Sequence, residues 1–138
     1  MNYDEYEKLC EQQRDANAKY IGIFEEDLKE AGLKPKTINN HLSNIDLYIN
    51  DYLLRMEPLE MSDGCGYEID GFLGDFFIRK CMWSTPTTVK STAASIKKFY
   101  KSMLKHGHVD KDRYQELTDE IKDSMEIWQA ECEEYNNF

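Results

Sequence analysis

The stretch Ser84-Thr85-Pro86-Thr87-Thr88-Val89 decides the fold, because it combines a helix cap, a proline and the first apolar residue of a helix. The same plan stands 51 residues earlier, in Leu33-Lys34-Pro35-Lys36-Thr37-Ile38. Proline suits the first helical position, because the N–H that it lacks would have no partner within the helix there. Thr85, the residue before this proline, can cap the helix that follows. Apolar residues then recur at helical spacing after both starts. We predict two amphipathic helices, over 35–54 and 86–105.

The rest of the chain also has helical spacing, and no run of residues alternates like a strand. We predict further helices over 3–31, over 67–82, and from Asp110 or Asp112 to Tyr135. The residues between them, 55–66, are expected to form a loop.

Glycines and polar residues mark where these helices end or bend. Gly32 and Gly107 are expected to end helices, as glycine commonly does. The polar middle of the first helix leaves open a break near Asp15–Asn17. Inside the third helix, Gly71 and Gly74 are expected to let another helix approach closely.

These elements predict an all-α fold, a compact orthogonal bundle of four core helices plus a terminal helix. We expect a single domain, 1–138, in which an acidic helix, 113–138, follows a core at about 18–112. The last helix has a heptad-like apolar face, which suits either packing within the chain or a homodimer seam at 114–135. This face consists of Tyr114, Leu117, Ile121, Met125, Trp128, Cys132 and Tyr135.

The composition indicates an acidic protein with enough apolar residues for a core. Hydrophobic residues make up 41 % of the 138, and the formal net charge is −10. No apolar run reaches the roughly 18 residues that a membrane span needs. The acidic start lacks the basic region of a signal peptide. We therefore expect a cytoplasmic protein without a membrane partner.

Motifs for catalysis or metal binding are missing from the sequence. The four cysteines, Cys10, Cys65, Cys81 and Cys132, are widely spaced, which favours reduced thiols. His106 and His108 stand too close together for half of a zinc finger. No G-x-S-x-G, H-E-x-x-H or P-loop motif occurs. We expect no enzyme activity, no metal and no cofactor.

Charge is distributed unevenly along the chain. Residues 79–113 carry nine basic and two acidic side chains, whereas 114–138 carry one basic and eight acidic. At ~100° per residue, Lys97, Lys101 and Lys105 fall within about 60° of Lys90 on a helix. We call these four residues the lysine stripe. Such a stripe suits a phosphate backbone, but a solvated face is an open alternative, as is masking by the acidic last helix.

The two stretches together resemble the SAM-like core-binding domain of phage integrases and other tyrosine recombinases. The resemblance rests on Gly32-Leu33-Lys34-Pro35-Lys36-Thr37-Ile38, on Ser84-Thr85-Pro86-Thr87-Thr88-Val89, on Ile96-Lys97-Lys98-Phe99-Tyr100 and on Gly107. It covers about residues 18–112 and implies a four-helix bundle that clamps one side of duplex DNA. The family's strand-exchange chemistry needs a second domain, and this chain has 4 arginines and no H-x-x-R. We expect the module to stand alone, without a catalytic domain.

The resemblance also implies which residues face the DNA. Lysines would neutralise phosphates, hydroxyls would bond phosphate oxygens, and asparagine can pair with the edge of adenine. For the threonines, helix capping is the alternative role. The implied DNA-binding residues are Lys34, Lys36, Thr37, Asn40, His41, Thr85, Thr87, Thr88, Lys90, Ser91, Lys97, Lys98 and Lys101.

Two functions therefore stay open for this sequence. The first is a non-catalytic module that binds duplex DNA through the lysine stripe. The second is a protein-interaction or assembly module, with a recombinase or another protein as its partner, or a prophage remnant; either keeps the fold but not DNA binding.

Overall fold

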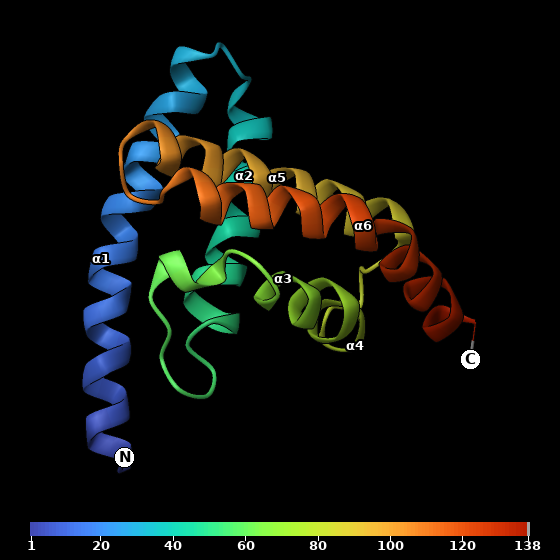
Figure 1. Ribbon diagram of the computed structural model, residues 1–138, viewed down its shortest axis with the longest axis horizontal. Helices are drawn as coiled ribbons and strands as arrows, with labels where there is room; N and C mark the ends of the chain where they lie inside the picture. The colour runs from blue at the N-terminus through green and yellow to red at the C-terminus, as the bar shows by residue number, and fades with distance from the viewer. Residues whose placement is uncertain (138) are drawn as a thin grey trace. The chain divides into compact units, whose positions relative to one another are not determined.

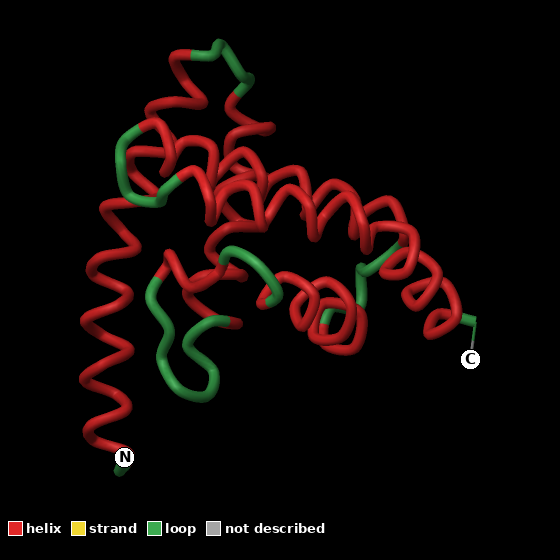
Figure 2. Tube along the Cα trace, viewed as in Figure 1, coloured by secondary structure: helices red, strands yellow, loops and turns green. Residues whose placement is uncertain are grey.

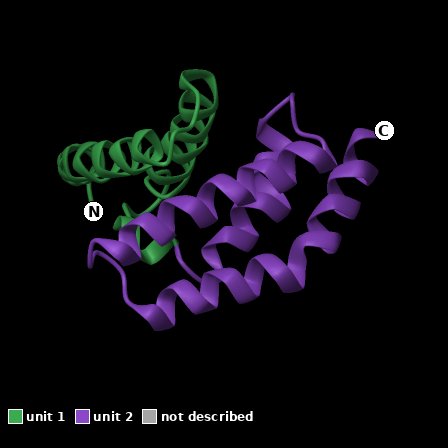
Figure 3. Cartoon of the chain, turned by 90° about the horizontal axis from the view of Figure 1, so that it is seen from above, with its two compact units in different colours: residues 1–64 green, residues 65–138 purple. Residues whose placement is uncertain are grey.

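The computed structural model describes residues 1–137, which are all-helical and contain no strand (Figures 1 and 2). The all-α prediction is therefore confirmed. The chain divides into two compact units, residues 1–64 and residues 65–138 (Figure 3). The single-domain organisation stays a prediction. Every helix in the described residues is too short or too polar to span a lipid bilayer.

The first unit begins with one uninterrupted helix, α1, over Tyr3–Glu30. The Asn2 side chain caps it by accepting a hydrogen bond from the Glu5 N–H, at 2.9 Å. Gly32 ends it with a φ of 79°, and the Leu33 N–H donates to the Leu28 carbonyl across that turn. The alternative of a break near Asp15–Asn17 is therefore wrong.

Asn17 is the one buried residue in the polar middle of α1, residues 11–20. Opposite it lies α2, Pro35–Asp46, which continues as the π-helix η1, Leu47–Tyr52. The Asn17 amide donates to the Ile49 carbonyl at 3.2 Å and to the Asn50 side chain at 2.8 Å. Carbonyls in the last turn of a helix have no partner within the helix. A buried amide on α1 thus supplies the missing donor, which an apolar residue could not do.

The end of η1 is tied to α1 and to the loop that follows. The Leu54 carbonyl accepts hydrogen bonds from the Tyr6 hydroxyl at 2.5 Å and from the Cys10 thiol at 3.7 Å. The Tyr48 hydroxyl donates to the Gly64 carbonyl. The predicted loop over 55–66 holds one short 3₁₀ helix, η2, at Met61–Gly64.

The second unit contains the predicted third helix in three consecutive parts. They are α3, Glu68–Gly71; the π-helix η3, Phe72–Phe76; and α4, Phe77–Lys80. The long helices α5, Pro86–Lys105, and α6, Lys111–Asn136, follow and lie side by side in opposite directions (Figures 1 and 3). The α5 bounds match the predicted ones, and Asp110 caps α6 as predicted.

Trp128 joins α6 to the helical stretch 68–80. Its side chain is fully buried, and the indole N–H donates to the Asp70 carboxylate at 2.7 Å. A Cβ placed on Gly74 would lie 2.9 Å from the Trp128 ring. Gly74 therefore allows a close approach of another helix, as the sequence indicated, because only hydrogen leaves room for the indole.

We predict that Gly74→Ala lowers the free energy of unfolding by about 1–3 kcal/mol, because the buried, hydrogen-bonded indole cannot move aside. Gly22→Ala is the matched control, since a Cβ there meets nothing within 4 Å. It should leave stability unchanged or raise it by up to about 1 kcal/mol, because alanine favours helix. Urea unfolding followed by circular dichroism measures both, and equal effects at the two sites would contradict the packing argument.

Candidate nucleic-acid interface

Helix α5 has an apolar face in the core and a lysine face in solvent. Val89, Ile96 and Tyr100 are fully buried. Lys90, Lys97 and Lys101, from the lysine stripe, are exposed, and so is the neighbouring Lys98. The amphipathic pattern read from the sequence is therefore present in the helix.

These four lysines are not neutralised by their own chain. None of them forms an ion pair with a carboxylate within 4 Å among residues 1–137. Ion pairs do form elsewhere, between Lys29 and Glu25 at 3.2 Å and between Arg79 and Asp75 at 2.7 Å. Helix α6 packs along α5 but leaves the four lysines exposed, so it does not mask them.

The stretch around the stripe is free of acidic residues. Between Phe76 and Val109 there is no aspartate or glutamate, although the chain has 27 of them. Seven lysines and arginines lie in the same stretch. The charged side chains of helix α5 itself are therefore all positive, and the acidic charge near it comes from α6, which packs along it.

The threonines at the start of α5 cap the helix. The Thr85 hydroxyl accepts from the Thr88 N–H at 3.1 Å, and the Thr88 hydroxyl accepts from the Thr85 N–H at 2.7 Å. This reciprocal pair is a capping box. Thr87 is exposed and uncommitted, while the Ser91 hydroxyl donates to the Thr88 carbonyl at 3.2 Å. The capping role proposed for Thr85 and Thr88 is thus confirmed.

The candidate residues of the first stretch lie on α2, in the other unit. Lys34, Lys36, Thr37 and Asn40 are exposed there. His41 is half-buried, with its ring 6.4 Å from the ring of Phe24. The cap residue Lys34 makes no side-chain capping bond, so the start of α2 lacks the box found at α5.

An exposed apolar pair, Met82 and Trp83, precedes the lysine stripe in the sequence and is not among the predicted site residues. The sequence pattern predicts Met82 at the end of a helix and no role for Trp83. Both lie in the turn between α4 and α5 and are exposed. Only Trp83 lies outside the predicted helices, which is a signal in the sequence, and the exposure of both side chains depends on how the turn folds.

Other groups of the described residues offer little chemistry. All four cysteines are buried and none is in a disulfide, and burial raises the pKa of the Cys81 thiol, which keeps it protonated at neutral pH. No cluster of histidine, cysteine, aspartate and glutamate suited to a metal is present in 1–137.

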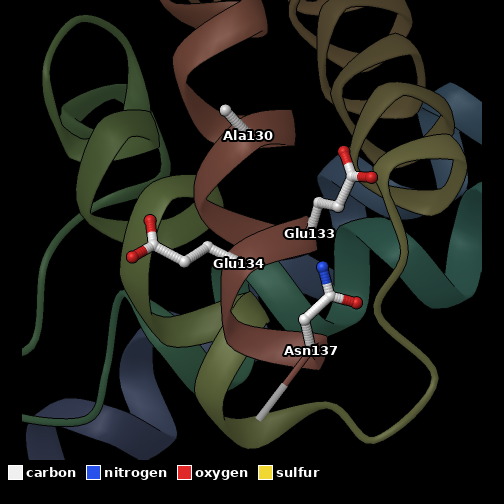
Figure 4. A pocket seen from close by; sticks show the side chains of 4 residues that line it. All are labelled: Ala130, Glu133, Glu134 and Asn137. Atoms are coloured by element: carbon white, nitrogen blue, oxygen red, sulfur yellow. The ribbon is translucent and has the colours of Figure 1, made fainter.

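A hollow of about 440 Å³ lies along the last turns of α6. Its lining comes from one helix, at Ala130, Glu133, Glu134 and Asn137 (Figure 4). The two glutamates point in different directions there, and both are exposed. They form a solvated face rather than a pair that could share a proton or an ion.

We predict that Thr85→Ala lowers the free energy of unfolding by about 1 kcal/mol, because it removes one half of the capping box. Thr87→Ala, two residues away and exposed, should change it by less than about 0.5 kcal/mol. Chemical unfolding of the two variants gives the comparison. An equal loss in both would mean that the box does not stabilise α5.

Comparison with protein-family models, with curated proteins and with solved structures gives no match for this chain. The resemblance to the recombinase core-binding domain therefore stays a prediction. The interface has to be judged from its own residues.

Proposed function

We propose that this protein is a non-catalytic module of the SAM-like core-binding type that binds duplex DNA through the lysine stripe on α5. The observation that carries the proposal is the exposure of Lys90, Lys97, Lys98 and Lys101 without a carboxylate partner. These lysines are gathered on one helix face in a stretch without any acid.

The part of the lysine stripe from Lys90 to Lys101 has a length that suits a DNA backbone. Lys90 and Lys101 are eleven residues apart, which is about 16 Å along a helix. This length corresponds to roughly five base pairs at 3.4 Å per step. Contacts to about four or five phosphates would make the logarithm of the binding constant fall with the logarithm of salt concentration at a slope near −4.

The negative net charge of both units limits the affinity for DNA. Residues 1–64 carry seven basic and fourteen acidic side chains, for −7, and residues 65–138 carry ten and thirteen, for −3. This negative net charge repels DNA at long range. At about 0.1 M salt, the repulsion is screened over a Debye length of about 10 Å. We therefore propose weak, strongly salt-dependent binding without much sequence preference from the lysines themselves.

Assembly through α6 is less well supported. Of the seven residues of its heptad-like face, Leu117, Trp128 and Cys132 are buried within the chain, and only Tyr135 is exposed. A seam between two copies would need most of that face to be available. The apolar face of α6 is instead used for packing, which favours the DNA-binding proposal over a homodimer through 114–135.

We predict that Lys97→Glu combined with Lys101→Glu abolishes binding to a short DNA duplex at low salt, because two phosphate contacts become repulsive. Fluorescence anisotropy of a labelled duplex measures the affinity. Circular dichroism should show unchanged helix content, since both side chains are exposed.

Lys8→Glu combined with Lys19→Glu is the matched control. It changes the net charge by the same amount, and both lysines are exposed on α1. Binding should weaken only slightly in this variant. If the native protein binds no duplex at low salt, or if both double variants lose binding equally, the proposed interface is wrong.

A further inference from the structure

The turn between α4 and α5 presents two large apolar side chains to solvent. Met82 is fully exposed and Trp83 is 61 % exposed, whereas the residues on either side, Cys81 and Ser84, are buried. Exposing a tryptophan beside a methionine forgoes burial that each side chain would gain in a core. Contiguous exposed apolar surface is a feature of binding sites, and these two side chains are adjacent in the sequence.

The turn is held in place on both sides of Trp83. The Ser84 hydroxyl donates to the Ile78 carbonyl at 3.2 Å, and the Asn136 amide donates to the Ser84 carbonyl at 2.8 Å. The Gln129 amide donates to the Pro86 carbonyl at 2.9 Å. The buried ring of Phe77 meets the indole edge-to-face, with ring centres 6.4 Å apart. Because the turn is already ordered, a ligand would not have to order it on binding.

The charges nearest to Trp83 in the sequence are positive, while α6 brings the acidic Glu133 to the same turn, between Gln129 and Asn136. The turn lies inside the acid-free stretch of 76–109, after the exposed Arg79 and Lys80. Arg79 makes a two-bond ion pair with Asp75, so Lys80 is the nearer uncommitted cation on that side. On the other side, Lys90 begins the lysine stripe about 8 Å along the helix axis from the Thr85 cap. Along the helix axis, the start of α5 and the first lysine of the stripe are therefore about two nucleotides apart.

We propose that Trp83, supported by Met82, is a stacking platform for an unpaired base, and that the preferred ligand is DNA with a junction between duplex and single strand. This inference rests on the proposed function. Inside a duplex both faces of each base are covered by its neighbours, so an indole can stack only on a base that is unpaired or at an end. The lysine stripe would hold the duplex backbone, and the turn would take the first unpaired base.

The test compares two labelled DNA probes that carry the same charge. Each has a duplex of about fifteen base pairs and an overhang of about four nucleotides, either thymidines or abasic sites. The native protein should bind the thymidine probe roughly 5- to 100-fold more tightly. Trp83→Ala should bind both probes equally and should retain the affinity of the native protein for the abasic one. Trp83→Phe should keep part of the preference, because phenylalanine also stacks.

Tyr67→Ala is the matched control, because Tyr67 is an exposed aromatic residue of the same unit that lies outside the acid-free stretch. It should keep the full preference. If the native protein binds both probes equally, or if Trp83→Ala keeps the preference, the stacking platform is wrong while the lysine interface stands. If no probe is bound, the proposed function and this inference both fail. A lower sedimentation mass for Trp83→Ala than for the native protein would show that the pair contacts a second copy, which also overturns the inference.

Discussion

The contact between Trp128 and the backbone at Gly74 is the constraint on which the second unit depends. The indole lies where a side chain at position 74 would be, and its N–H is fixed by the Asp70 carboxylate. This contact sets the distance between α6 and the helical stretch 68–80. Because α6 also packs along α5, the same contact positions the helix that carries the lysines.

The position of α6 affects both the turn before α5 and the faces of α5 itself. Its residues Gln129 and Asn136 bond the backbone at the start of α5, so the turn with Trp83 has a defined shape. Along α5, the apolar side chains are in the core and the lysines are left outside. Within the described residues, the acidic last helix therefore supports α5 without forming ion pairs with Lys90, Lys97, Lys98 or Lys101.

Local signals allowed much of the fold to be predicted. Proline at the first position placed the starts of α2 and α5, and Gly32 and Gly107 both adopt the positive φ that ends a helix. These features depend on a few neighbouring residues, so they can be read without tertiary information. The two π-helices could not be predicted in this way, because the hydrogen bonds that define them differ from those of an α-helix by one residue and leave the apolar spacing almost unchanged.

The polar and aromatic details of the candidate site were harder to predict. From the sequence, Asn17 is expected to interrupt α1. Its hydrogen bond to the Ile49 carbonyl, 32 residues away, explains why a polar residue is buried within a continuous helix. The lysine stripe follows from helical geometry alone, whereas the exposure of Trp83 depends on a turn held by residues about fifty positions away.

The two tryptophans of this chain have opposite environments. Trp128 is enclosed and hydrogen-bonded, and Trp83 faces water, while residues 1–64 contain neither. Their ultraviolet emission should therefore differ in wavelength and in access to a soluble quencher such as acrylamide. The emission of Trp128 would report whether α6 stays packed against the helical stretch 68–80. The emission of Trp83 would report ligand binding at the turn before α5. The natural sequence thus contains two spectroscopic probes for its second unit, and no dye has to be attached to observe them.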